Sequence, residues 1–155
     1  MPRQRTLVKA SKLLRAKRFA EVISLLEPQV FLYRDNFSFY YLLGIACLYV
    51  GDFGGAFSYL QRAEQLNHGH AGTLLGLAAV HLRRREMPQA LSHWLKILDE
   101  DTRNKTAKRG LELVRKTDDP SEFVAMAESG RLKRFYPRLG FRFPFWIVPI
   151  VLVAA

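Results

Sequence analysis

Apolar side chains recur at spacings of three and four residues through most of the chain, which is the pattern of helices that bury one face. Within residues 37–70, a first stripe includes Tyr40 and Leu43, and a second begins at Phe53 and continues through Leu60. Each stripe is long enough for three or four helical turns. The pattern predicts two helices that pack against each other in antiparallel fashion.

A turn signal separates these two stripes. Gly51 can adopt the left-handed conformation that closes a helix, and Asp52 can cap the N-terminus of the next helix. Gly44, on the inner face of the first stripe, leaves room where a neighbouring helix must approach closely. The segment therefore predicts a helical hairpin with a tight connection.

The same side-chain sizes return every 34 residues, which is the mark of a repeat architecture. Small, aromatic and bulky types recur in phase at Ala10, Gly44 and Ala78, at Phe19, Phe53 and Met87, and at Leu26, Leu60 and Trp94. We predict three repeats, over residues 3–36, 37–70 and 71–104.

A fourth unit, residues 105–130, keeps the register but is more polar. Glu112 occupies the small-residue position, and Arg115 replaces an apolar residue. Since the last apolar face of a helical array would otherwise meet water, we expect this unit to be a capping pair of helices, Lys105–Lys116 and Pro120–Ser129.

The repeat resembles the tetratricopeptide repeat (TPR). The residues that carry the resemblance are Tyr40, Leu43-Gly44, Tyr49, Gly51-Asp52-Phe53, Ala56, Leu60 and Ala63 in the second unit, Leu77-Ala78, Ala90 and Trp94 in the third, and Ala10, Phe19 and Leu26 in the first. The resemblance implies an all-α fold, in which antiparallel hairpins stack into a right-handed superhelical solenoid. The solenoid is followed here by an apolar C-terminal segment.

The resemblance also implies a binding surface, because the first helices of TPR units line a concave groove that holds partner segments. The positions expected to bind a partner are Tyr41, Ile45, Leu48, Tyr49, Leu75, Ala79 and Leu82. They are apolar or aromatic, which suits an amphipathic helix or an extended hydrophobic segment of another protein. The alternative is that these side chains only pack between adjacent helices.

The family's carboxylate-binding clamp, built from lysine, asparagine and arginine, is replaced here by Leu7, Ser11, Leu42, Gly72 and Gly76. We therefore do not expect this chain to hold the tail of a chaperone.

The formal net charge of +10 is concentrated at the two ends of the chain. Residues 131–142 form a basic linker that carries Arg131, Lys133, Arg134, Arg138 and Arg142, and residues 143–155 are uncharged and apolar. Thirteen residues of helix span roughly 20 Å, less than the roughly 30 Å hydrocarbon layer of a membrane. We expect residues 143–155 to be the start of a transmembrane helix that continues past Ala155, with the basic residues at the lipid head groups.

Two alternatives for residues 143–155 remain open: they can fold back onto the helical array, or they can occupy the groove of a neighbouring molecule. In the favoured interpretation, the repeats form a cytoplasmic domain anchored at the inner membrane. No signal peptide is expected, because the first residues lead into no apolar core.

Other functional classes lack support in the sequence. We find no phosphate-binding loop, nucleophile elbow or His-Glu-x-x-His motif, so we expect no enzyme, catalytic residue or cofactor. The histidines lie at no recognisable metal-ligand spacing, and no metal site is expected. The sequence predicts a protein-interaction adaptor or scaffold. The alternative is a soluble structural subunit of a larger bacterial assembly, with nucleic-acid binding a distant third; the oligomeric state stays open.

Overall fold

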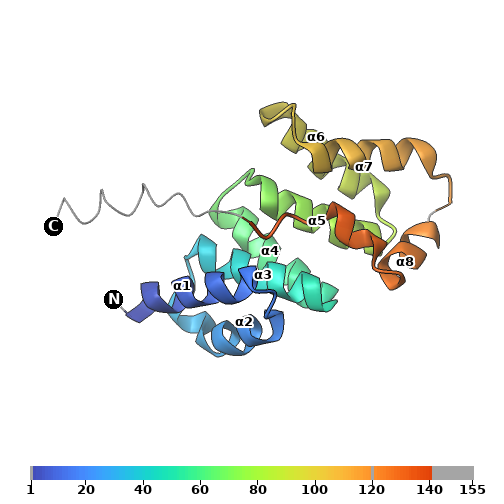
Figure 1. Cartoon of the computed structure of the whole chain (residues 1–155). Coiled ribbons are helices and arrows are strands. Elements are labelled where there is room, and N and C mark those ends of the chain that lie inside the picture. The colour runs from blue at the N-terminus through green and yellow to red at the C-terminus, as the bar shows by residue number, and fades with distance from the viewer. Residues whose placement is uncertain (1, 120, 141–155) are drawn as a thin grey trace.

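The computed structural model describes residues 2–119 and 121–140, and within these residues all regular secondary structure is helical (Figure 1). Residues 143–155 lie outside the described residues, so the predicted transmembrane segment is not part of the structure. The described elements are α1 (Pro2–Arg15), α2 (Phe19–Leu26), η1 (Glu27–Tyr33), α3 (Phe37–Val50), α4 (Phe53–Leu66), α5 (Ala71–Arg83), α6 (Met87–Glu100), α7 (Lys105–Lys116), α8 (Ser121–Glu128) and η2 (Arg131–Phe135).

The helices begin at a constant interval. The second helices of successive units start at Phe19, Phe53, Met87 and Ser121, which are steps of 34 residues. Polar side chains set the starts of the first helices at the same interval: Asn36, His70 and Asn104 each accept a hydrogen bond from a backbone N–H three residues later.

The turns inside the hairpins repeat as well. Gly51 has a φ of 87°, and the Asp52 side chain accepts a hydrogen bond from the Gly55 N–H at 2.9 Å, which confirms the predicted turn and cap. Lys17 and Arg85 occupy the equivalent turns with φ of 61° and 63°. The left-handed turn is therefore a property of the repeat, and it persists where glycine is replaced by a residue that adopts this conformation less readily.

Bulky side chains from the second helices fill gaps left by small residues on the first helices. A methyl group on Gly44 would come within 2.8 Å of the Leu60 side chain, and one on Gly76, in the next unit, within 2.7 Å of it. A methyl group on Gly110 would overlap the ring of Trp94. Leu60 thus holds the consecutive first helices α3 and α5 against α4. Trp94, 34 residues later, packs against α7 as Leu60 packs against α5.

The helices pack in chain order from α1 to α7, and α3 also contacts α1 and α5. Helix α3 is covered on several sides, which explains why Phe39–Leu48 is an unbroken buried run instead of a one-sided stripe. Ala10, Gly44 and Ala78, the small residues that recur in the sequence, are all buried in these contacts.

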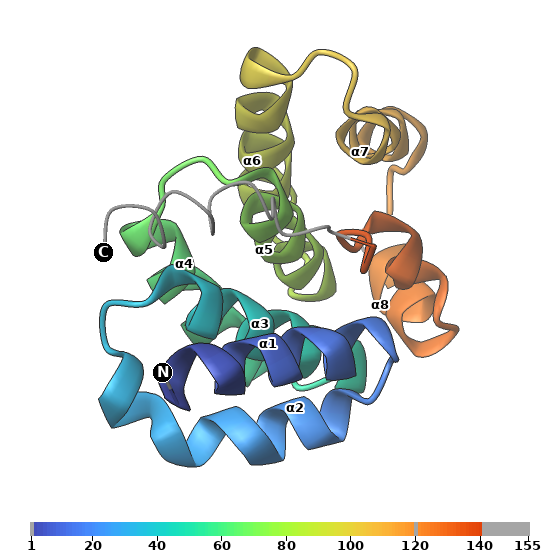
Figure 2. The ribbon, with the colours of Figure 1, turned by 60° about the vertical axis from the view of Figure 1, so that its left-hand side comes forward.

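The fourth unit differs from the expected capping pair. Helix α7 packs on α6, as a further first helix would, but α8 packs on α5 and η2 and does not lie along α7 (Figure 2). The two positions that would join a second helix to α7 are acidic: Glu112 stands in phase with Gly44, and Glu128 stands in phase with Trp94. Because both side chains are charged and exposed, nothing interlocks α8 with α7.

None of the helices in residues 2–119 and 121–140 combines the length and apolar character that a membrane span needs.

The contact between Gly110 and Trp94 gives a test of the packing. We expect Gly110→Ala to lower the free energy of unfolding by about 1–3 kcal/mol, because the added methyl group overlaps a rigid ring in a packed core. The control is Gly54→Ala on α4, where the nearest atom, Asp52 Oδ1, would be 3.8 Å from the new methyl group. That exchange should raise stability by up to about 1 kcal/mol. Urea unfolding followed by circular dichroism measures both; equal effects would contradict the packing.

Candidate functional site

The seven predicted partner-binding residues lie on α3 and α5, but they are not an open surface. Tyr41 is 9% exposed, Leu75 is 6% exposed, and Tyr49 is half-buried. The other four, Ile45, Leu48, Ala79 and Leu82, are at most 1% exposed. We expected these residues to line an open groove, and the structure shows that six of them are buried. Whether a partner binds them stays a prediction.

The chain's own C-terminal part packs on both helices and covers part of this face, at Tyr49. Helix α8 and η2 both pack on α5, and the following residues reach Tyr49 on α3. The Tyr49 hydroxyl donates a hydrogen bond to the Pro137 carbonyl at 3.1 Å, and its ring lies edge-on to Tyr136, with centroids 5.1 Å apart. Burial raises the pKa of the Tyr49 hydroxyl and raises the pKa of Tyr136 to about 12, so both stay neutral.

The first part of the predicted basic linker, residues 131–140, has its own apolar contacts. Leu132, Phe135 and Tyr136 are buried, and the ring of Phe135 lies 6.1 Å from that of Trp94. The spacing of three and then one residue between these side chains is the signal that one face of a short helical turn packs inward. The sequence analysis considered only the charge of this segment and did not predict that these three side chains are buried.

Of the five predicted membrane-proximal basic residues, the four that the structure describes do not all line one recess. Arg131 and Arg134 line a cleft, whereas Lys133 and Arg138 are exposed and do not line it. Arg142 lies outside the described residues. Two of the predicted basic residues therefore contribute to a cleft.

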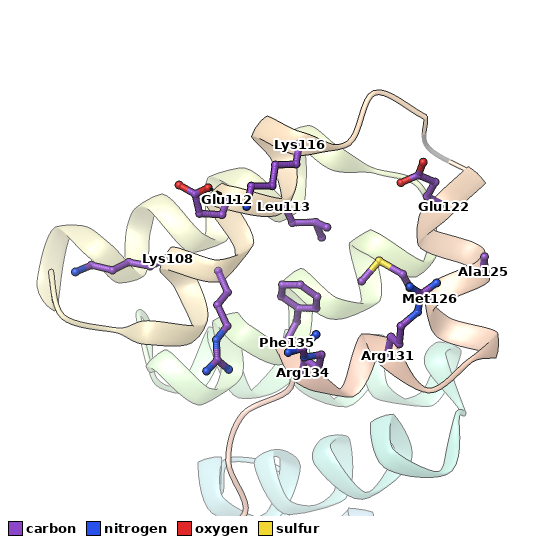
Figure 3. A pocket seen from close by; sticks show the side chains of 11 residues that line it. Lys108, Glu112, Leu113, Lys116, Glu122, Ala125, Met126, Arg131, Arg134 and Phe135 are labelled. Carbon is purple, nitrogen blue, oxygen red and sulfur yellow. Dashed lines mark ion pairs between the residues drawn. The ribbon is translucent and has the colours of Figure 1, made fainter.

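The cleft lies between α7, α8 and η2 and has a volume of about 790 Å³ (Figure 3). It exists because α8 leaves α7 and returns to α5. Its lining is Lys108, Arg109, Glu112, Leu113 and Lys116 from α7, Glu122, Ala125 and Met126 from α8, and Arg131, Arg134 and Phe135 from η2. Five of these residues are basic and two are acidic, so the cleft is electropositive.

A smaller cavity is lined by two histidines, His81 and His93. His81 Nδ1 lies 2.6 Å from Glu86 Oε2, and the His81 and His93 rings stack at 5.3 Å. Across residues 2–119 and 121–140, no group of three or more His, Cys, Asp or Glu side chains is placed to hold a metal ion.

Burial raises the pKa of the Cys47 thiol to about 12, so that group is a poor nucleophile near neutral pH.

Comparison with known proteins bears on the fold. No protein-family model matches the chain, and no curated protein matches it. Among solved structures, the chain is similar to a mutant of the O-GlcNAc transferase of Thermobaculum terrenum, a TPR-containing protein, with a TM-score of 0.65 and 20% sequence identity. The alignment covers 83% of this chain and 26% of that one. The described helices fit a TPR-like repeat fold.

The likeness to the transferase concerns the fold alone. This chain spans about a quarter of the transferase, so that protein's activity does not transfer. The face of α5 that carries Leu75, Ala79 and Leu82 is buried, and α8 and η2 both pack on this helix. The corresponding face of α7, which carries Arg109, Leu113 and Lys116, opens onto the cleft.

The hydrogen bond to Pro137 gives a test of this coverage. We expect Tyr49→Phe to cost about 1 kcal/mol of unfolding free energy. It should also speed hydrogen exchange of the backbone amides of residues 132–136. The control is Tyr33→Phe, because the Tyr33 hydroxyl donates to the Arg3 carbonyl at 3.0 Å, far from η2. Mass spectrometry measures the exchange; equal protection of residues 132–136 in both variants would show that Tyr49 does not hold this segment.

The contact between α5 and α6 gives a pH prediction. Burial, followed by the neighbouring His81, lowers the pKa of His93 from 6.5 to about 4. Between these two values the unfolded chain binds more protons than the folded one, so stability falls as the pH falls from 6.5 to 4. We expect His93→Gln to reduce this slope. Thermal unfolding across this range measures it; a parent-like slope in His93→Gln would contradict the assignment.

Proposed function

We propose that this chain is a protein-interaction module that binds a segment of another protein and performs no chemistry of its own. The observation that carries the proposal is the TPR-like arrangement of the helices, because stacked hairpins of this kind present extended concave surfaces for partners. We further propose that the hairpins form a right-handed solenoid and that no cofactor takes part.

The partner has two routes to the concave side. It can displace η2 and the residues that follow, and then contact Tyr49, Leu75 and the other predicted groove residues. Alternatively, it can bind where the concave side is already open, at the cleft beside α7. The second route needs no rearrangement, which lowers the free-energy cost of association.

Attachment to a membrane is a separate proposal from the sequence. It rests on the apolar residues 143–155 and on a cytoplasmic location for the repeats. Neither is needed for the interaction role.

One observation favours the alternative role as a structural subunit. Phe31 and Leu32 on η1 are 78% and 52% exposed, and large apolar side chains at such a position suit packing against another subunit. If the chain has this role, the particle measured in solution should be heavier than one copy of the chain, or a second protein should copurify with it. Replacing Phe31 and Leu32 should then abolish that association.

Site-specific photo-crosslinking in cells that express the full chain tests the interaction role. A photoreactive residue at Ala125, exposed in the cleft, is compared with one at Leu95, exposed on α6. We expect discrete protein adducts from position 125, identified by mass spectrometry, and few from position 95. Equal adducts from both positions would show that the concave side has no special role, and the absence of adducts at both would contradict the proposed function.

A further inference from the structure

Most basic side chains of the cleft between α7, α8 and η2 are not neutralised by a carboxylate of the described residues. Within the described residues, Lys108, Arg109, Arg131 and Arg134 form no ion pair. These four side chains come from two elements separated in sequence by the whole of α8, and the fold brings them to one recess. A recess lined by one sign of charge raises the local concentration of the opposite charge.

The acidic residues of the cleft do not cancel this charge. Glu112 already faces Arg115 Nη1 at 3.5 Å and Lys116 Nζ at 3.8 Å, both on α7. Glu122 lies on α8, across the recess from these residues (Figure 3). Arg131 Nε donates a hydrogen bond to Ser129 Oγ at 3.1 Å, but no carboxylate of the described residues pairs with Lys108 or with the three arginines. Their charges are therefore available to carboxylates from outside.

The floor of the cleft is apolar. Leu113 and Met126 are half-buried, Phe135 is buried, and Figure 3 shows these three side chains directed toward the middle of the recess from α7, α8 and η2. Met126 can adapt its shape to different apolar groups. A ligand that fits both parts of the lining carries an apolar side chain flanked by negative charges.

We propose that this cleft binds an acidic amphipathic segment of a partner protein, placing its apolar side chains on Leu113, Met126 and Phe135 and its carboxylates on the surrounding basic residues. The proposal rests on the proposed function, and it adds where the partner binds and which chemistry recognises it. It differs from binding in the apolar groove that the sequence predicts, because the cleft is at the fourth unit and is basic.

The lining favours a polypeptide over nucleic acid or a lipid surface. Single-stranded nucleic acid needs exposed aromatic side chains for stacking, and the one aromatic residue here, Phe135, is only 6% exposed. A membrane surface is bound by faces that protrude, whereas these basic side chains line a recess between helices.

The cleft is preformed, because two of its three walls rest on the same core side chain. Gly110 brings α7 directly onto Trp94, and the ring of Phe135 on η2 lies 6.1 Å from the ring of Trp94. The partner segment therefore orders itself on a fixed site, which limits the entropic cost to one side of the interface.

Selection from a library of random peptides on the immobilised full chain, at physiological salt, tests the proposal. We expect the enriched peptides to share a net negative charge and at least one bulky apolar residue. Binding is then measured by fluorescence anisotropy with labelled copies of these peptides. The double charge reversal Arg109→Glu with Arg134→Glu should raise Kd by about tenfold or more.

Two matched controls separate the cleft from general effects. Lys9→Glu with Lys12→Glu makes the same change in net charge at exposed positions of α1, away from the cleft, and should keep Kd within about twofold of the parent value. Leu113→Ser should weaken binding, whereas Leu95→Ser, at an exposed position of α6, should not. Circular dichroism must show parental helicity in each variant.

The outcomes distinguish this proposal from the function on which it rests. Enriched peptides that are neutral or basic, or that bind the cleft double reversal and the parent equally, would overturn the cleft proposal and leave the interaction role standing. Binding of single-stranded DNA or phosphatidylserine vesicles that depends on Arg109 and Arg134, without peptide binding, would also overturn it. If no peptide is enriched at all, the interaction role itself is contradicted.

Discussion

The structure depends on one steric arrangement, a bulky side chain from a second helix inserted between small residues of two first helices. Leu60 lies against Gly44 in its own unit and against Gly76 in the next, at distances that leave no room for a methyl group on either glycine. Trp94 repeats the second of these contacts, against Gly110 on α7. Because interiors are close-packed, this fit sets the separation and the direction of successive hairpins.

The cleft that we propose as the binding site arises because this steric arrangement is absent from the fourth unit. At the fourth unit, Glu112 and Glu128 replace the small and the bulky partner, so α8 has no place beside α7. It packs on α5 and η2 instead. The same rearrangement leaves the inner face of α7 open as an electropositive cleft. Because α8 does not interlock with α7, the fourth unit has a basic cleft where the earlier units bury apolar side chains.

Local sequence signals predicted the helices of the repeats and both helices of the fourth unit, but not how α8 and η2 pack. Gly51 and Asp52 predict their turn because a left-handed residue and a cap act within a few residues of each other. The contact between Tyr49 and Pro137 joins residues 88 apart, and no local pattern encodes it. The charge of residues 131–142 drew attention away from Leu132 and Phe135, whose spacing could have indicated a packed turn. Likewise, Gly76 and Gly110 recur in phase, and their match to Leu60 and Trp94 becomes visible only once the helices are placed.

The most direct test of the steric arrangement is a double-mutant cycle between its two partners in the last intact contact. Gly110→Ala is introduced alone and together with Trp94→Leu, and the free energy of unfolding is measured for all four proteins. If the ring of Trp94 is what the added methyl group meets, Gly110→Ala should cost at least about 1 kcal/mol less in the Trp94→Leu background than in the parent. Equal costs in the two backgrounds would show that Gly110 and Trp94 act independently, and would contradict the account.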